Sequence, residues 1–114
     1  MVEIVEKPWG FYEVLVDEPI YKVKRITIKP NELISLQYHG YRNEFWVVVD
    51  GELNVYVDGI TKTLKYGDGV IINKSEKHRA VNYCNRNCVF IEIQTGDKLL
   101  EEDIIRLQDK YGRV

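Results

Sequence analysis

Short runs that alternate between apolar and polar residues fill most of the chain. Such alternation places every second side chain on one face, which is typical of half-buried β-strands. The branched and aromatic residues within the runs also favour strands. The pattern predicts strands over residues 11–16, 20–29, 33–39, 44–50, 53–58, 61–65, 69–73, 78–83 and 88–94.

Turn residues separate these runs. The Asp-Gly pairs at 50–51 and 58–59 are two-residue hairpin sequences, because glycine adopts positive φ at no steric cost. Residues 30–31 and 67–69 mark further turns. Many short strands at this spacing indicate an all-β sandwich or small barrel.

The final stretch has a different period. Its apolar residues recur at spacings of four, three and four, as in a helical stripe: Leu100, Ile104, Leu107 and Tyr111. Acidic residues 101–103 suit the positive end of a helix dipole. We therefore predict a short packing helix over residues 100–111, after a terminal arm over 1–7 and a barrel over 8–95.

Composition narrows the class of protein. A length of 114 residues is that of one domain, and 45% hydrophobic and 11% aromatic residues indicate a folded chain. A formal charge of −2 excludes a broadly basic nucleic-acid binder. No apolar run reaches the about 18 residues that a membrane span needs. We therefore expect neither a nucleic-acid nor a membrane partner.

The N-terminus and the cysteines suggest a compartment. The first residues have neither a basic start nor an apolar core, so no signal peptide is visible and a cytoplasmic protein is expected. Cys84 and Cys88 are too few for a structural zinc site, which takes four ligands. Reduced thiols are expected in that compartment.

Four residues of metal-ligand type occupy strand positions that could face one interior. Alternation puts Gln37 and His39 on one face, Glu44 begins the next strand, and His78 begins a later one. Two imidazoles, a carboxylate and an amide oxygen suit a divalent transition metal. Each residue alone also has an ordinary structural explanation, so this hypothesis depends on the combined spacing.

That spacing resembles the first motif of the cupin superfamily, which reads Gly, five residues, His-x-His, three or four residues, Glu, six residues, Gly. Here Gln37, His39, Glu44 and Gly51 occupy matching positions. Gln37 replaces the first histidine of the motif, and Asn31 replaces its first glycine.

The second cupin motif reads Gly, five residues, Pro-x-Gly, two residues, His, three residues, Asn. Gly67, His78 and Asn82 fit it, whereas Asn73 and Ser75 replace the proline and the glycine. Two blocks in register make the resemblance specific, and it implies a single-domain cupin, a double-stranded β-helix or jelly-roll barrel.

A narrower resemblance covers nearly the whole chain. It is to the type II mannose-6-phosphate isomerase domain, which usually forms the C-terminal part of a bifunctional mannose-1-phosphate guanylyltransferase/mannose-6-phosphate isomerase. The glutamine at position 37 is typical of that family, whereas Gly40 and Tyr41 depart from its His-rich run. The matching segments are residues 7–15, 21–26, 36–39, 42–49, 92–96, 102–106 and 111–113.

This resemblance implies a metal-dependent enzyme that interconverts mannose 6-phosphate and fructose 6-phosphate by proton transfer between C1 and C2. The implied metal ligands are Gln37, His39, Glu44 and His78. Zinc is the first choice of metal, with manganese, iron, cobalt or nickel as alternatives.

Further roles follow for residues near these ligands. Glu92 is the first candidate base, although alternation alone leaves it as free to face solvent as the interior, and Lys24 is a second candidate. Arg42 is the first candidate for the phosphate. The set of predicted substrate residues is Arg42, Arg25, Arg79 and Trp46.

Other readings stay open. The chain could be a non-catalytic cupin that binds a sugar or sugar phosphate, a partner module of a separate guanylyltransferase, or a cupin enzyme acting on a nucleotide sugar. It contains no Gly-rich nucleotide-binding segment, so we do not expect nucleotidyl transfer from it. A homodimer is expected, with the aromatic segment 8–12 as an edge strand.

Overall fold

Two antiparallel sheets make up the computed structural model, which describes residues 3–113. The larger sheet contains, in spatial order, β1 (Glu3–Lys7), β2 (Gly10–Asp17), β3 (Tyr21–Ile28), β10 (Cys88–Gly96), β5 (Arg42–Asp50) and β8 (Gly69–Ile72). The smaller contains β11 (Ile105–Gln108), β4 (Leu36–Tyr38), β9 (His78–Val81), β6 (Leu53–Val57) and β7 (Ile60–Leu64). The prediction of an all-β fold is confirmed.

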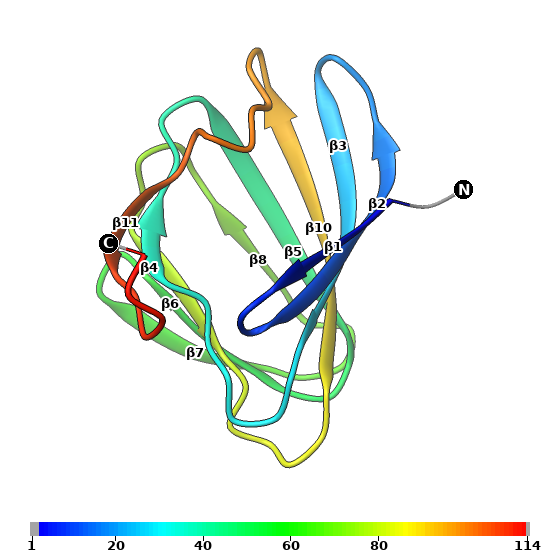
Figure 1. The fold of residues 1–114 in the computed structure, drawn as a ribbon, viewed down its shortest axis with the longest axis vertical. Helices are drawn as coiled ribbons and strands as arrows, with labels where there is room; N and C mark the ends of the chain where they lie inside the picture. The colour runs from blue at the N-terminus through cyan, green and yellow to red at the C-terminus, as the bar shows by residue number, and fades with distance from the viewer. Residues whose placement is uncertain (1–2, 114) are drawn as a thin grey trace.

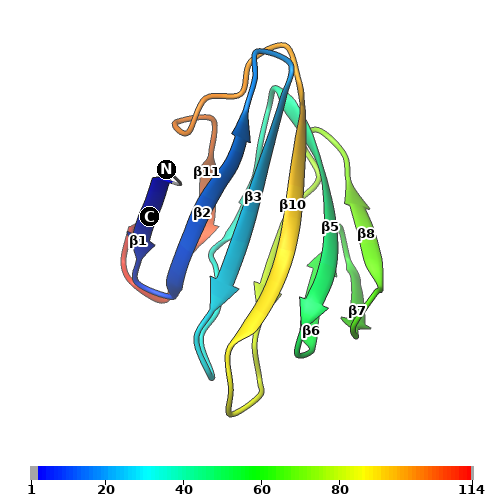
Figure 2. The same ribbon diagram turned by 90° about the vertical axis from the view of Figure 1, so that its right-hand side faces the viewer.

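The two sheets face each other as the walls of a barrel (Figure 1), and the larger sheet curves along one side of it (Figure 2). Strand alternation sends every second side chain into the space between them. Each strand predicted from the sequence corresponds to an observed one. The largest change is that the run 33–39 is reduced to β4, Leu36–Tyr38.

The inward-facing side chains change from apolar to charged along the larger sheet. At one level Phe90 of β10 lies opposite Val48 of β5 and Ile26 of β3. Two residues further along β10, Glu92 lies opposite Lys24 and is likewise buried. One half of the barrel is therefore an apolar core, and the other half is a polar interior.

The terminal arm predicted over residues 1–7 is instead largely a strand. Residues 1–2 lie outside the described part, and β1 pairs with β2 in a hairpin whose register joins Lys7 to Gly10. Glycine is required at position 10, because a Cβ there would lie 2.0 Å from the Thr27 carbonyl oxygen. Trp9 is buried inside the subunit and β1 is the sheet edge, so segment 8–12 is not an edge strand. Homodimerisation stays a prediction.

The helix predicted over residues 100–111 is wrong. That stretch contains turns and β11. Separately, residues 3–113 form no helix with the length and hydrophobicity that crossing a membrane requires. Leu100 and Leu107 are 48% and 38% exposed, whereas Ile104 and Tyr111 are half-buried, so the four apolar residues do not form one buried helical face. The free edge of β4 instead pairs with β11, with Arg106 opposite Gln37. The pairing of β11 with β4 therefore outweighed the local helical period of the sequence.

Candidate active site

Two histidines and a glutamate converge in the polar half of the barrel. His39 follows β4, Glu44 lies in β5, and His78 begins β9. Nε2 of His39 is 3.2 Å from Oε2 of Glu44, and Nε2 of His78 is 4.0 Å from Oε1. One ligand atom from each residue lies within 4.8 Å of the others, and no side chain is more than 2% exposed. We call these three residues the ligand group.

The hydrogen bonds of both imidazoles direct their Nε2 atoms towards Glu44. Nδ1 of His39 donates to the Asp103 carbonyl oxygen at 2.7 Å, and Nδ1 of His78 donates to the Glu76 carbonyl oxygen at 2.9 Å. Carbonyl oxygens only accept, so each Nε2 keeps its lone pair. Within residues 3–113, Nε2 of His78 has no hydrogen-bond partner at all.

Burial keeps both imidazoles neutral. It lowers the pKa of His78, and it lowers the pKa of His39 to about 4, an effect to which the nearby charge of Arg42 adds. A neutral imidazole whose other nitrogen donates to a carbonyl is the usual form of a metal ligand. The ligand group therefore fits a divalent cation, with two nitrogen donors and a carboxylate.

Gln37 lies beside the ligand group and points its amide nitrogen towards His39. Its Nε2 is 3.4 Å from Nε2 of His39, and its Oε1 accepts a hydrogen bond of 2.6 Å from the Ser35 hydroxyl. The amide must rotate to present its oxygen to a metal. An oxygen ligand at Gln37 stays a prediction.

Arg42 and Trp46 hold the two oxygens of Glu44. Nε of Arg42 donates to Oε2 at 2.8 Å, and Nε1 of Trp46 donates to Oε1 at 3.0 Å. Arg42 also reaches the Leu100 carbonyl oxygen at 3.2 Å and Nε2 of His39 at 3.4 Å. Its guanidinium thus neutralises a buried carboxylate, which raises the pKa of Arg42 against the opposing effect of burial.

Glu92 is a second buried carboxyl group, 5% exposed. Its Oε1 accepts from Nε1 of Trp46 at 3.2 Å, and its Oε2 accepts from Nε2 of Gln94 at 2.8 Å. Burial, with the charge of Glu44 adding to it, raises the pKa of Glu92 to about 7. A carboxyl group with that pKa exchanges protons near neutral pH, as a general base must.

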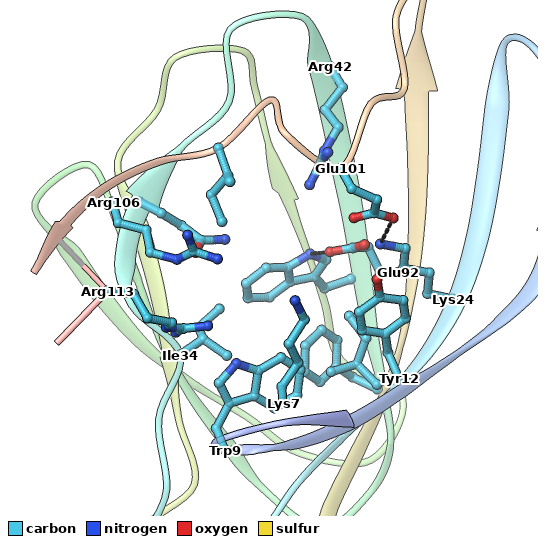
Figure 3. A pocket seen from close by; sticks show the side chains of 15 residues that line it. Lys7, Trp9, Tyr12, Lys24, Ile34, Arg42, Glu92, Glu101, Arg106 and Arg113 are labelled. Atoms are coloured by element: carbon cyan, nitrogen blue, oxygen red, sulfur yellow. Dashed lines mark hydrogen bonds and ion pairs between the residues drawn. The ribbon is translucent and has the colours of Figure 1, made fainter. Parts of the chain in front are cut away.

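Several of the side chains described above border one cavity of about 110 Å³, several times the space that a water molecule needs (Figure 3). Gln37, Arg42, Trp46, Glu92 and Lys24 line it. The ligand group does not line the cavity. Because Gln37 and Arg42 both line it and contact His39, they form the wall that faces the ligand group.

The family described as "Mannose-6-phosphate isomerase C-terminal" matches residues 1–109. The chain belongs to this family. The "Mannose-1-phosphate guanylyltransferase" of Escherichia coli K12 is 40% identical to this isomerase-family domain over 110 residues, and "Alginate biosynthesis protein AlgA" of Pseudomonas aeruginosa is 39% identical over 109. Each match covers 96% of this chain but 23% of the relative, so the domain spans about a quarter of their length.

Solved structures confirm the predicted cupin fold. The capsular polysaccharide assembling protein CapF of Staphylococcus aureus superposes with a TM-score of 0.84 at 17% identity, covering 95% of this domain and 33% of that chain. A Klebsiella pneumoniae protein with a double-stranded β-helix domain gives 0.73 at 20% identity, covering 85% and 83%. At these identities the likeness shows the fold alone. The isomerase-family domain is thus a double-stranded β-helix cupin.

Two of the predicted substrate residues of this cupin domain lie outside the cavity. Arg25 of β3 points outwards, where its Nη2 pairs with Oε2 of Glu13 at 2.6 Å. Arg79 of β9 donates to the Ile34 and Gln108 carbonyl oxygens, each at 3.2 Å. Alternation explains both positions, because the neighbouring Lys24 and His78 take the inward positions.

The cavity is also lined by charged residues for which the sequence analysis predicted no part in the site. They are Lys7, Glu101, Arg106 and Arg113. Lys7 belongs to the stretch predicted as an arm, and the other three belong to or follow the stretch predicted as a helix. Residues 104–108 also fit an alternating strand with Ile104 and Arg106 on one face, so the inward position of Arg106 could have been predicted from the sequence.

Lys24, the second predicted catalytic residue, is held in place by Glu101. Oε1 of Glu101 lies 2.7 Å from Nζ of Lys24, and that ammonium group also lies 4.0 Å from the centre of the Tyr12 ring. Burial opposes ionisation of Glu101, but the Lys24 ammonium outweighs it and lowers the pKa of this carboxyl group. Lys24 is therefore held at the cavity wall beside Glu92.

Proposed function

We propose that this domain is a metal-dependent sugar-phosphate isomerase that interconverts mannose 6-phosphate and fructose 6-phosphate. The observation that carries the proposal is the placement of Glu92. Its carboxyl group, with a pKa raised to about 7, lines the cavity and shares the Trp46 indole donor with Glu44 of the ligand group. The family description and the sugar-phosphate relatives support the choice of substrate.

Aldose–ketose isomerisation moves a proton between C2 and C1 through an enediolate. Glu92 accepts the proton from C2 of mannose 6-phosphate and returns it to C1, which the near-neutral pKa of its carboxyl group allows. The hydroxyl proton of O2 passes to O1 in the enediolate, so that C2 becomes the carbonyl carbon and C1 carries the hydroxyl group. The Lys24 ammonium group, held by Glu101, faces the same cavity and stabilises negative charge on the neighbouring substrate oxygen.

The ligand group would hold the metal, with Gln37 adding its oxygen after amide rotation. A bound divalent ion supplies Lewis-acid polarisation of the substrate carbonyl. Zinc accepts imidazole nitrogen and carboxylate oxygen, and manganese, iron, cobalt and nickel accept the same donors. Arg42, at the wall facing the ligand group, balances the charge of Glu44.

The test is a coupled assay of fructose 6-phosphate formed from mannose 6-phosphate. The protein is treated with a chelator and then supplied with each of the five metals in turn. We expect turnover that vanishes with chelation and returns with at least one metal. Turnover no higher than that of the buffer blank with every metal would contradict the proposal.

A second candidate function is the binding of a sugar phosphate without turnover. The position of Arg42 favours it, because that side chain lies between the cavity and the ligand group and is paired with Glu44. Metal analysis separates the two functions. Metal-free protein that binds mannose 6-phosphate and converts none of it would identify the binding module.

A further inference from the structure

Three cationic side chains border the cavity away from Glu92. Lys7 ends β1, Arg106 lies in β11, and Arg113 follows that strand. Figure 3 shows Arg106 and Arg113 reaching in from one side and Lys7 from below, whereas Glu92 lies across the drawn cavity. We call Lys7, Arg106 and Arg113 the basic cluster.

Two members of the basic cluster, Lys7 and Arg106, have no neutralising carboxylate, unlike the other cations of the cavity. Arg42 is paired with Glu44 at 2.8 Å and Lys24 with Glu101 at 2.7 Å. Arg113 is paired with Asp109, its Nε lying 2.6 Å from Oδ2. Within residues 3–113, neither Lys7 nor Arg106 has a carboxylate partner within 4.0 Å.

Arg106 also has an unsatisfied donor. Its Nε is buried and has no hydrogen-bond partner among the described residues. A buried guanidinium N–H without an acceptor is unfavourable, and a bound oxyanion would remove that cost. The two uncompensated positive charges of Lys7 and Arg106 match the two negative charges of a phosphate monoester, and the guanidinium fork matches its oxygens.

Electrostatic repulsion within the cluster points to the same ligand. Burial lowers the pKa of Lys7, and the charges of Arg106 and Arg113 lower it further. Burial and then the charge of Arg113 lower the pKa of Arg106. Like charges held together in a cavity wall attract an anion into it.

We propose that the basic cluster binds the phosphate group of the sugar phosphate, so that the sugar extends across the cavity with C1 and C2 at Glu92. This inference rests on the proposed function for its substrate. It assigns the phosphate to the basic cluster in place of Arg42, whose guanidinium is committed to Glu44.

The experiment compares Arg106→Ala with Arg25→Ala, which removes the same charge from the outer face. We expect Arg106→Ala to raise KM for mannose 6-phosphate about 10- to 100-fold, the effect of a charge-assisted hydrogen bond, with metal content unchanged. Arg106→Lys keeps the charge without the fork and should recover part of the loss. Arg25→Ala should match the wild type.

A binding measurement keeps this inference separate from the isomerase proposal. Calorimetric titration with mannose 6-phosphate, and with inorganic phosphate as competitor, needs no turnover. If Arg106→Ala loses binding and Arg25→Ala keeps it, the result supports the basic cluster even if the wild type converts no substrate. Equal affinity in Arg106→Ala and wild type overturns the inference even if the wild type is an isomerase. If Arg106→Ala does not fold, Lys7→Met is judged by the same two outcomes.

Discussion

The ligand group and the basic cluster both belong to the polar interior of the barrel, but they are built differently. The ligand group is nearly inaccessible to solvent, and its residues come from or adjoin strands of both sheets. The basic cluster comes from the two outer stretches of the chain, and Arg106 keeps a buried donor without a partner. Folding therefore completes the first region, whereas a bound anion is needed to complete the second.

The largest expected effect comes from breaking the ligand group. His78→Ala removes one of two imidazole donors, and within residues 3–113 no third histidine exists to replace it. We expect metal affinity to fall by at least about 100-fold, since even changes beside metal ligands cost 10- to 100-fold, and turnover to fall with it. Metal analysis after dialysis measures the loss.

The matched control is Arg79→Ala, on the same strand but facing away from the cavity. It should keep both metal and activity. Metal retained in His78→Ala at the wild-type level would show that the ligand group is not the metal site.

Glu92→Gln separates proton transfer from metal binding. We expect turnover to fall about 100-fold or more, because the amide cannot accept the proton, while metal content stays unchanged. In the wild type the rate should rise with pH through about 7, since only ionised Glu92 acts as a base and its pKa is raised to about 7. A pH–rate profile measures this limb, and its persistence in Glu92→Gln would assign the base elsewhere.

Asp109→Asn tests how the basic cluster is oriented. The carboxylate binds the Arg113 guanidinium through two contacts, of 2.6 and 3.1 Å, and this pairing lowers the pKa of Asp109 from 3.8 to about 2. Because the pKa of Asp109 is lower in the folded chain, its ionised carboxylate stabilises the fold above pH 3.8. This contribution disappears as the pH falls through 2. The variant should lose about 1 kcal/mol at neutral pH and converge with the wild type near pH 2.

Urea unfolding across that pH range measures the difference. Asp109→Asn should also raise KM for mannose 6-phosphate modestly, because Arg113 loses its fixed orientation. A stability difference that stays constant down to pH 2 would show that the pairing with Arg113 is not its origin.

The smallest effect is expected at Arg25, which is outside both regions. Its partner Glu13 lies on the same outer face, and exposed ion pairs contribute little to stability. Arg25→Ala should leave KM, metal content and the urea midpoint at wild-type values. A raised KM would return Arg25 to the substrate residues.

The sequence predicted the barrel strands and the ligand group because both depend on local, regular spacing. Alternation fixes which face His39 and Glu44 occupy, and hairpin turns fix the neighbouring strands. The basic cluster could not be predicted in that way. The inward position of Arg106 depends on β11 pairing with β4, across nearly seventy residues of chain, while the local period favoured a helix.

Glu92 shows a second limit. Alternation alone gave no preference between an outward and an inward carboxyl group flanked by isoleucines. The structure turns it inwards, where each neighbouring strand supplies a buried polar group at that level: the Lys24 ammonium group in β3 and the Trp46 indole N–H in β5. The partners that stabilise Glu92 are visible only once the sheet order is known.

The contacts of Asp103 make the geometry at His39 depend on a late part of the chain. Its carbonyl oxygen accepts from Nδ1 of His39, and its carboxylate accepts from the backbone N–H groups of Gly40 and Tyr41, each at 2.9 Å. The ribosome makes β1 to β10 before it makes Asp103, Arg106 or Arg113. A nascent chain stopped after β10 would contain both histidines without the group that orients His39. A product truncated after β10 would therefore lack both the Asp103 contact of His39 and the strand β11 that pairs with the edge of β4.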